Sequence, residues 1–434
     1  MRFIFLIALV VLTACSSLEF LGEGPPPPLP GERIAILKGN NQLLADPALA
    51  GIAVQLPDPF LNTAWPQAGG YPNHMMGHLS LGGGLRQLWK VDAGRGNDKQ
   101  YILAAPIADQ GRIFTIDVEA KAYALSLQEG KKLWVADLAP PKGGRAEIGG
   151  GGLALDGESL IATTGYGEVI ALDVNDGKIL WRKQVNSPIR AAPTITNGRI
   201  LVITVDNRTL ALSSKDGATL WTHEGINEPV TLLGAASAAA DEGIFVVPYS
   251  SGELFGLRQD TGRVLWSDSL ISPRRSNQLA SLGAISGLPV LDKGLVVAIG
   301  HGGRMLGLEA KTGGRVWDQE LGGTETPWVA GDFIFVQGSD GILRCILRRD
   351  GRVRWASLLP QGKDKDKPIL YSGPILAGGK LFSVSSKGDL MMIDPYTGQI
   401  MGKHDIGEPV LIPPIVVNNT LLLLSVKGNL IALR

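Results

Sequence analysis

A tryptophan repeat runs through most of this chain and restricts the folds that it can adopt. Seven of the nine tryptophans recur at intervals of 38 to 51 residues, and six of them stand four residues after the glycine of a turn sequence such as Asp176-Gly177. An eighth turn, Thr397-Gly398, has Gly402 in place of the tryptophan. Repeats of this length build arrays of one supersecondary unit. The seven tryptophans are Trp89, Trp134, Trp181, Trp221, Trp266, Trp317 and Trp355.

Each repeat is composed of short β-rich segments. Residues 200–205 are continuous apolar and β-branched residues, and residues 169–172 form the segment before the Asp176-Gly177 turn. Glycine accounts for 57 of the 434 residues, which favours many tight turns. A unit of about 45 residues with four strands and no room for a helix is a propeller blade. The sequence therefore predicts an all-β propeller of four-stranded antiparallel blades over residues 61–434.

The two ends of the repeat region complement each other. The repeats begin at Leu85–Trp89 with a fourth strand that nothing precedes, and residues 427–434 form a third strand that no turn or tryptophan follows. If the N-terminal strand completes the last blade, the ring has eight blades and no free edge, which is the part of a sheet prone to aggregation. Seven closed blades would leave two apolar half-blades unburied. We therefore expect eight blades.

Composition excludes several classes of protein. The 41 Lys and Arg residues balance the 41 Asp and Glu residues, so no net field attracts nucleic acid. Charged residues make up 19% of the chain, and too little excess charge exists to keep it disordered. Two cysteines cannot form a disulfide framework.

The N-terminus is typical of a bacterial lipoprotein. Residues 3–12 are an uninterrupted apolar run, too short for a mature spanning helix but suited to a signal peptide. The following Leu12-Thr13-Ala14-Cys15 resembles a lipobox, whose cysteine is acylated. We expect residues 1–14 to be a signal peptide and 15–60 a lipid-anchored, Pro-rich tether; Ser16 and Ser17 imply sorting to the periplasmic face of the outer membrane of a Gram-negative bacterium. The alternative is an ordinary signal peptide with an incidental cysteine.

The best repeat, from Ala171-Leu172-Asp173 to Trp181, resembles the tryptophan-docking motif of pyrroloquinoline-quinone-type propellers. Two groups share that fold: quinoprotein dehydrogenases and the BamB lipoproteins of the outer-membrane β-barrel assembly (BAM) machinery. A lipobox, a tether and one eight-bladed ring are similar to BamB, and residues 62–70 are similar to its alphaproteobacterial branch. This resemblance implies a non-enzymatic scaffold without cofactor or metal. It would bind the BamA-like central barrel subunit through that subunit's periplasmic domains, and nascent outer-membrane proteins are a further expected partner.

The dehydrogenase alternative requires groups that the sequence hardly supplies. Dehydrogenases of this fold are typically larger, and many carry two adjacent cysteines over the quinone. Here Cys345 is the one cysteine outside the lipobox. They also need a Ca²⁺ site and an aspartate base. We expect Asp117, Asp173 and Asp394 each to close a third strand and cap its turn. A propeller that binds a small periplasmic ligand in its central channel remains a third alternative.

Other residues that could carry chemistry have structural explanations. Cys345 stands where neighbouring repeats carry Ala or Gly, so a small packing residue is expected. His74 and His78 have the spacing of metal ligands on one helical face, but they lie in a Gly- and Pro-rich segment without a carboxylate nearby. The glycine runs 149–152 and 300–303 do not lie between a strand and a helix, as phosphate-binding loops do.

The resemblance to BamB also indicates a partner surface. In that family the surface lies on loops between consecutive central blades and uses an arginine with apolar and acidic neighbours. The matching loop here is Ser187-Pro188-Ile189-Arg190-Ala191-Ala192-Pro193, and the next blade's equivalent contains Glu228. We expect Arg190, supported by Ile189 and Glu228, to bind the partner. The alternative is that Arg190 only neutralises its loop.

Overall fold

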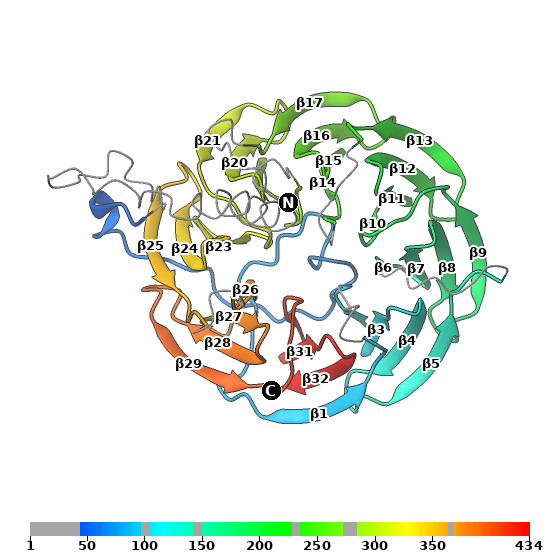
Figure 1. Ribbon diagram of the computed structural model, residues 1–434, viewed down its shortest axis with the longest axis horizontal. Helices are drawn as coiled ribbons and strands as arrows, with labels where there is room; N and C mark the ends of the chain where they lie inside the picture. The colour runs from blue at the N-terminus through cyan, green and yellow to red at the C-terminus, as the bar shows by residue number, and fades with distance from the viewer. Residues whose placement is uncertain (1–43, 97–103, 142–149, 228–234, 272–283, 363–367) are drawn as a thin grey trace, which may run out of the picture. The chain divides into compact units, whose positions relative to one another are not determined.

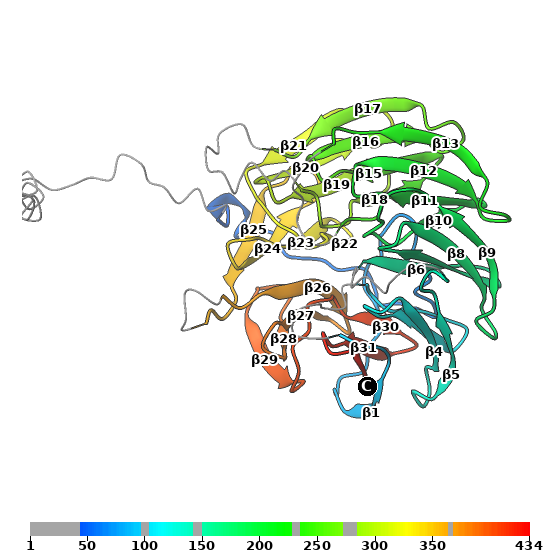
Figure 2. The ribbon, with the colours of Figure 1, turned by 45° about the vertical axis from the view of Figure 1, so that its right-hand side comes forward.

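The protein is a closed ring of β-sheets arranged around a central axis (Figure 1). The computed structural model describes residues 44–96, 104–141, 150–227, 235–271, 284–362 and 368–434. These residues form eight antiparallel sheets of four strands each, which we number as blades 1 to 8. The first strand of each blade lies nearest the ring axis, and the fourth strand forms the rim; β9, β13 and β17 are such rim strands in Figure 2. The predicted eight-bladed propeller is confirmed.

The strands follow the same order in every blade. Blade 1 contains β2 (Ile107–Asp109), β3 (Arg112–Ile116), β4 (Lys121–Ser126) and β5 (Lys132–Asp137); blade 2 contains β6 (Gly151–Asp156), β7 (Ser159–Thr164), β8 (Glu168–Asp173) and β9 (Ile179–Gln184); blade 3 contains β10 (Thr194–Thr196), β11 (Arg199–Ile203), β12 (Arg208–Ser213) and β13 (Thr219–Glu224); blade 4 contains β14 (Ala239–Asp241), β15 (Ile244–Pro248), β16 (Glu253–Arg258) and β17 (Val264–Ser269). Blade 5 contains β18 (Val290–Asp292), β19 (Leu295–Gly300), β20 (Arg304–Glu309) and β21 (Arg315–Gln319); blade 6 contains β22 (Trp328–Ala330), β23 (Phe333–Gln337), β24 (Ile342–Leu347) and β25 (Val353–Leu358); blade 7 contains β26 (Tyr371–Ala377), β27 (Lys380–Ser385), β28 (Asp389–Ile393) and β29 (Ile400–Asp405); blade 8 contains β30 (Ile415–Val417), β31 (Thr420–Leu424), β32 (Asn429–Leu433) and β1 (Gln87–Asp92).

The N-terminal strand closes the ring. Strand β1 pairs antiparallel with β32, with Trp89 opposite Ala432 and Val91 opposite Leu430. The backbone amides and carbonyls of Arg86 and Arg434 also bond to each other, at 2.8 and 2.9 Å. Blade 8 is therefore built from both ends of the repeat region, as predicted, and no turn joins its third and fourth strands.

The repeated tryptophans join neighbouring blades. The indole N–H of Trp266 donates to the Ala310 carbonyl of the next blade at 2.7 Å, and four further tryptophans make the equivalent bond. A Cβ atom on the turn glycine of the next blade would lie only 2.5–2.9 Å from the tryptophan, so this turn must be glycine. The residue of the third strand that pairs with each tryptophan is small. These residues are Ala124, Ala171, Ala211, Gly256, Gly307, Cys345 and Ala432.

Blade 7 departs from this pattern because it borders the closure. Gly402 replaces its tryptophan, and the residue opposite is Met392 instead of a small one. An indole at position 402 would have no turn to rest on, because β32 and β1 of blade 8 are not joined. A Cβ built on Gly402 would have the Met392 methyl group 3.5 Å away, so the methionine stands beside the place of the missing indole.

We predict that residues 392 and 402 are energetically coupled. Gly402→Trp alone should destabilise the ring by about 1–3 kcal/mol, because the indole meets the Met392 side chain. Combining it with Met392→Ala should recover part of that loss, with a coupling energy of about 0.5–3 kcal/mol in a double-mutant cycle of urea unfolding. Strictly additive effects would show that the two residues do not share this space.

Two names are useful for the faces of the ring. The turn face carries the turns between strands one and two and between strands three and four of each blade. The loop face carries the connections between blades and the turns between strands two and three. Residues 60–81, which we call the belt, run around the ring axis at the turn face and appear as the blue segment at the centre of Figure 1.

The belt bonds to the innermost strand of every blade. Its backbone pairs with β2 through Trp65 and Ala108, at 2.6 and 2.9 Å, and it returns beside its own start at Phe60 and Leu79. It thereby covers the inner edges of these strands, which no other described strand pairs with. The contacts are Asn62 with blade 8, Trp65 with blade 1, Pro66 with blade 2, the Gln67 side chain with blade 3, Pro72 with blade 4, Asn73 and His74 with blade 5, Gly77 with blade 6 and Leu79 with blade 7.

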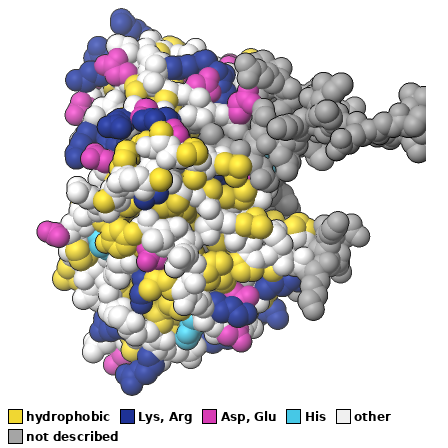
Figure 3. Space-filling model, turned by 90° about the vertical axis from the view of Figure 1, so that its left-hand side faces the viewer, with side chains coloured by type: hydrophobic (Ala, Val, Ile, Leu, Met, Phe, Trp, Pro, Cys, Tyr) yellow, Lys and Arg dark blue, Asp and Glu magenta, His cyan; other side chains and the backbone are white. Residues whose placement is uncertain are grey.

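Part of the predicted tether packs on the rim of blade 6. Asp46 donates its amide to the Val353 carbonyl at 2.8 Å and caps a short 3-10 helix, η1 (Pro47–Leu49). Leu49 and Val54 are buried in the same core cluster as Trp355. Residues 44–60 thus belong to the ring and not to a free tether, whereas residues 1–43 lie outside the described part. This side of the molecule is shown in Figure 3.

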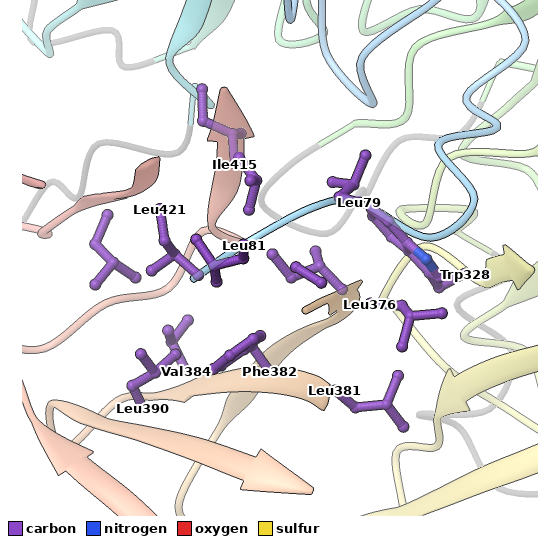
Figure 4. Close-up of a cluster of buried hydrophobic side chains, with 14 of the residues drawn as sticks. Leu79, Leu81, Trp328, Leu376, Leu381, Phe382, Val384, Leu390, Ile415 and Leu421 are labelled. Carbon is purple, nitrogen blue, oxygen red and sulfur yellow. The ribbon is translucent and has the colours of Figure 1, made fainter. Parts of the chain in front are cut away.

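The largest buried cluster joins the belt to blades 6, 7 and 8 and to part of blade 1. Leu79 and Leu81 of the belt lie among Leu376, Phe382 and Leu421 of blades 7 and 8 (Figure 4). At about 1.5–3 kcal/mol for each fully buried large apolar side chain, the belt contributes substantially to stability.

Candidate partner-binding loop

The loop that carries Arg190 connects blade 2 to blade 3 on the loop face. Its residues run from Ser187 to Pro193, between β9 and β10. The Ile189 amide donates to the Thr164 carbonyl at 3.3 Å, and the Val205 amide donates to the Pro188 carbonyl at 2.9 Å. The loop is therefore held by both adjacent blades.

Ile189 and Arg190 have different environments. Ile189 is fully buried in the core cluster between blades 2 and 3, so it fixes the loop and offers no surface to a partner, contrary to our expectation. Arg190 is half-buried and lines a small cavity of about 30 Å³. Thr204, Asn207 and Ser250, from the neighbouring turns of blades 3 and 4, line the same cavity. That volume holds about two water molecules, which is too little for a cofactor.

Glu228 lies outside the described residues, but the start of its loop is defined. The Gly225 amide donates to the Asn207 carbonyl at 2.8 Å, and the Ile226 amide donates to the Glu253 carboxylate at 2.7 Å. Ile226 is 59% exposed although its backbone is held on both sides. It is an apolar contact candidate that the sequence did not single out, since it lies in no regular strand pattern.

A hydrogen-bonded network of Tyr249, His223 and Thr209 packs against the start of this second loop. The Tyr249 hydroxyl hydrogen bonds to His223 Nδ1 and to Thr209 Oγ1, each at 2.7 Å. A Cβ on Gly225 would lie 2.5 Å from the Tyr249 ring, so the chain can pass here only as glycine. Burial raises the pKa of Tyr249 and lowers that of His223, which keeps both neutral near pH 7. The network is a rigid support and not an acid–base pair.

The other candidates are structural. Cys345 is fully buried opposite Trp355, and burial raises the pKa of its thiol, so it is the expected small packing residue. Gly152 packs against Ala192, where a Cβ would approach the alanine Cβ to 2.5 Å, and Gly300 packs similarly against Leu270. Neither glycine run adjoins a helix in the described part of the chain.

The three aspartates cap turns, although one position differs from the expectation. Asp173 ends the third strand of blade 2 and Asp394 follows that of blade 7, and each accepts amides of the following turn. Asp117 instead follows the second strand of blade 1. Its carboxylate accepts the amides of Glu119 and Lys121 at 2.9 Å and the Tyr123 hydroxyl at 2.8 Å. An aspartate so occupied cannot serve as a base without breaking its turn.

The two histidines of the belt attach it to the blades. His78 donates from Nδ1 to the Pro57 carbonyl at 2.8 Å and accepts the Gly379 amide on Nε2 at 2.9 Å, so both ring nitrogens are used. His74 donates from Nδ1 to the Pro289 carbonyl at 2.7 Å. Among the described residues, no group of three His, Cys, Asp or Glu side chains is placed to hold a metal ion.

We predict that His74 makes stability depend on pH. Burial lowers its pKa to about 4, whereas the unfolded chain takes up the proton near pH 6.5. The contribution of His74 to the free energy of unfolding should therefore be constant above pH 6.5 and fall by about 1.4 kcal/mol per pH unit between pH 6.5 and 4. His74→Asn keeps a donor and suits the positive φ of 59° at this position, and it should remove this component of the pH dependence. Urea unfolding of the wild-type protein and the variant at pH 7 and pH 4.5 gives the change in unfolding free energy between the two pH values. An equal change in both proteins would contradict the assignment to His74.

None of the helices in the described residues is long and apolar enough to cross a membrane.

Comparison with known proteins identifies the family. The family model described as "Outer membrane protein assembly factor BamB" matches residues 118–357, which is more than half of the chain. The chain belongs to the BamB family. A BamB relative from Yersinia pestis is 23% identical over 353 residues, which cover 80% of this chain and 88% of the relative. The relative from Xanthomonas campestris is 26% identical over 357 residues, covering 80% and 85%. Both relatives are described as outer membrane protein assembly factors.

Solved structures share the propeller. BamB from Moraxella catarrhalis superposes with a TM-score of 0.64 at 20% identity and covers 81% of this chain and 97% of its own. The quinohemoprotein alcohol dehydrogenase from Comamonas testosteroni gives a TM-score of 0.66 at 12% identity, covering 85% and 80%. Such low identities show the fold alone. The family match, and not the fold, separates BamB from the dehydrogenases.

Proposed function

We propose that this BamB-family protein is a lipid-anchored, non-enzymatic subunit of the outer-membrane β-barrel assembly machinery that binds its central, BamA-like barrel subunit. The observation that carries the proposal is the loop from Ser187 to Pro193, in a chain whose relatives are outer-membrane assembly factors. Ile189 buries its side chain and so holds the backbone of Arg190 in place. Asn207 lines the same small cavity as Arg190 and also donates to the carbonyl of the exposed Ile226. An arginine with apolar and acidic neighbours is a frequent centre of protein interfaces.

Lipid attachment at Cys15 would localise the protein and raise its effective concentration at the partner, so that a modest interface suffices. Two or more acyl chains anchor stably. We expect the mature protein to begin with acylated Cys15 at the periplasmic face of the outer membrane. Mass spectrometry of its N-terminal peptide, with Cys15→Ser as the control, tests this part alone.

The predicted result for Arg190 is loss of the partner. Arg190→Glu should reduce recovery of the barrel subunit in a mild-detergent pull-down at least tenfold, because reversing a charge at an interface centre costs a few kcal/mol. Arg263→Glu is the matched control, since Arg263 is an exposed arginine on the turn face. It should leave recovery unchanged. Equal recovery with both variants would remove Arg190 from the interface.

A second candidate partner is the extended chain of nascent outer-membrane proteins. Seven rim strands carry an exposed aliphatic residue just before the tryptophan position, and each rim strand pairs on one side only within the described residues. Such edges can accept an added strand. These residues are Leu88, Leu133, Leu180, Leu220, Leu265, Val316 and Met401. A photo-crosslinker at Leu133 should capture newly exported outer-membrane proteins, and a crosslinker at the buried Leu153 should not.

A further inference from the structure

The rim strand of each blade has one edge that no other strand of the described chain pairs with. Backbone N–H and C=O groups along such an edge can pair with a further strand, and proteins usually prevent this with charged side chains, above all lysine, or by covering the edge. The eight rim strands can be compared at the residue that follows the tryptophan position. This residue lies in the regular part of the strand, beyond the β-bulge that all eight rim strands share.

Seven of the eight rim strands are protected at this position. Six carry a polar side chain there, which is charged in blades 2, 5, 7 and 8 and a hydroxyl in blades 3 and 4. These residues are Arg182, Asp318, Lys403, Lys90, Thr222 and Ser267. Blade 6 carries Ala356, but a chain segment packs on its rim strand. The Asp46 amide donates to the Val353 carbonyl at 2.8 Å, and the Arg354 guanidinium donates to the Ile52 carbonyl.

Blade 1 has neither form of protection among the described residues. Its rim strand β5, on the outside of the ring in Figure 1, carries Val135 after the tryptophan, with 50% of its surface exposed, and Leu133 before it, with 49% exposed. In none of the other rim strands do two exposed aliphatic residues flank the tryptophan position. Residues 133–136 form an uninterrupted apolar run, Leu-Trp-Val-Ala, on an edge strand. An edge of this kind is where a further strand adds most readily.

Blade 6 shows that the outer edge of a rim strand can hold a chain segment. Val353, whose carbonyl accepts the Asp46 amide, stands two residues before the tryptophan of its strand, and Lys132 has the same position in β5. The two strands have the same register against their neighbours, because Val353 pairs with Ile346 and Lys132 pairs with Leu125, each next to the bulge. The Lys132 carbonyl therefore lies on the outer edge of β5 as the Val353 carbonyl does on blade 6.

We infer that β5 is the rim strand that receives an extended segment of a nascent outer-membrane protein, as an added fifth strand of blade 1. A transmembrane β-strand suits this edge because its apolar and polar residues alternate, so its apolar side chains can lie beside Val135 while its polar side chains stay in solvent. Main-chain hydrogen bonds to β5 give the affinity, and the exposed valine gives the preference for alternating segments. The inference rests on the nascent chain as a proposed partner, but not on the Arg190 loop or the lipid anchor.

Binding of a strand-like peptide tests the assignment. The probe is a peptide of about 10 residues, the length of a transmembrane β-strand, in which valine and threonine alternate. It carries a fluorophore and a photo-crosslinking group and is added to the full-length lipoprotein in mild detergent. Fluorescence anisotropy measures binding, and mass spectrometry maps the crosslinked residues. A second peptide with the same side chains is N-methylated at its central residues, which removes the main-chain donors that strand pairing needs.

The alternating peptide should bind the wild-type protein and crosslink to residues 132–137, and the N-methylated peptide should not bind. Val135→Lys gives β5 the lysine that blades 7 and 8 carry at this position, and it should weaken binding about tenfold. Thr222→Lys is the matched control, because Thr222 is the equivalent exposed residue of blade 3, and it should leave binding unchanged. Both positions are exposed, so both variants should fold.

Three results would each overturn the inference: crosslinks spread over several rim strands, equal binding by Val135→Lys and the wild type, or equal binding of the two peptides. Capture of a second copy of this protein by the crosslinker at Leu133 would overturn it as well, since the edge would then serve self-association. The proposed partner fails by a different result, namely when that crosslinker captures no nascent outer-membrane protein in cells although the peptide maps to β5.

Discussion

Removal of residues 1–84 should leave a chain that no longer forms a stable ring. This truncation deletes the belt, which buries Trp65, Met76 and Leu79. At about 1.5–3 kcal/mol for each, these three side chains alone contribute about 5–9 kcal/mol, comparable with the 5–15 kcal/mol stability of a typical domain. The innermost strand of each blade also loses its bond to the belt. We expect aggregation, or rapid cleavage in limited proteolysis.

A shorter truncation is the control for this result. A chain that begins at Pro57 keeps the belt and the His78 bond to the Pro57 carbonyl, but it loses Leu49 and Val54 on blade 6. It should stay folded and be about 3–5 kcal/mol less stable in urea than a chain that begins at Leu44. If the chains beginning at residues 57 and 85 unfold at the same urea concentration, the belt does not hold the ring together.

The second large effect is expected at the tryptophans between blades. Trp266→Ala should destabilise the ring by about 3–5 kcal/mol, because it leaves a cavity between blades 4 and 5. The indole of Trp266 is 7% exposed and donates to the Ala310 carbonyl, which would lose its partner. Urea unfolding followed by tryptophan fluorescence and circular dichroism measures the change.

The residue next to it provides the comparison. Leu265 belongs to the same strand and points outward, with 36% of its surface exposed. Leu265→Ala should cost below about 1 kcal/mol, since little apolar surface is removed from the interior. If the two alanine variants lose similar amounts of unfolding free energy, the contact of the tryptophan with the next blade does not explain the stabilising effect of the repeat.

The position of the candidate loop between two blades followed from the sequence, but the burial and exposure of its side chains did not. The position of Arg190 between blades 2 and 3 comes directly from the strand order. That Ile189 is buried and that Ile226 is exposed depends on contacts with Thr164 and Asn207, which belong to other segments of blades 2 and 3. Periodicity reports which face of a strand is apolar. It does not report which loop residue another blade will cover.

The belt shows the same limit more clearly. Residues 59–85 contain no charged residue, and their Gly, Pro and aromatic content is typical of an irregular segment. His74 and His78 resembled a ligand pair there because local spacing was the one available guide. Their carbonyl partners, Pro289 and Pro57, are 215 and 21 residues away. The belt has no repeat of its own, since it meets each blade through different residues.

The sequence by itself determined the repeating architecture: four strands per unit, eight units, and closure by pairing β1 with β32. Turn glycines, rim tryptophans and small residues opposite them interact over one repeat, so their pattern appears in the chain. Only the tertiary structure decided that residues 46–54 cover blade 6, that the belt bonds to all eight blades, and that Met392 accompanies the missing tryptophan of blade 7. Residues 46–54 and the belt are held by contacts with segments that lie far away in the chain, such as Asp46 with Val353. Met392 faces Gly402 because the neighbouring blade, closed by β1, has no turn for an indole. No local repeat encodes either arrangement.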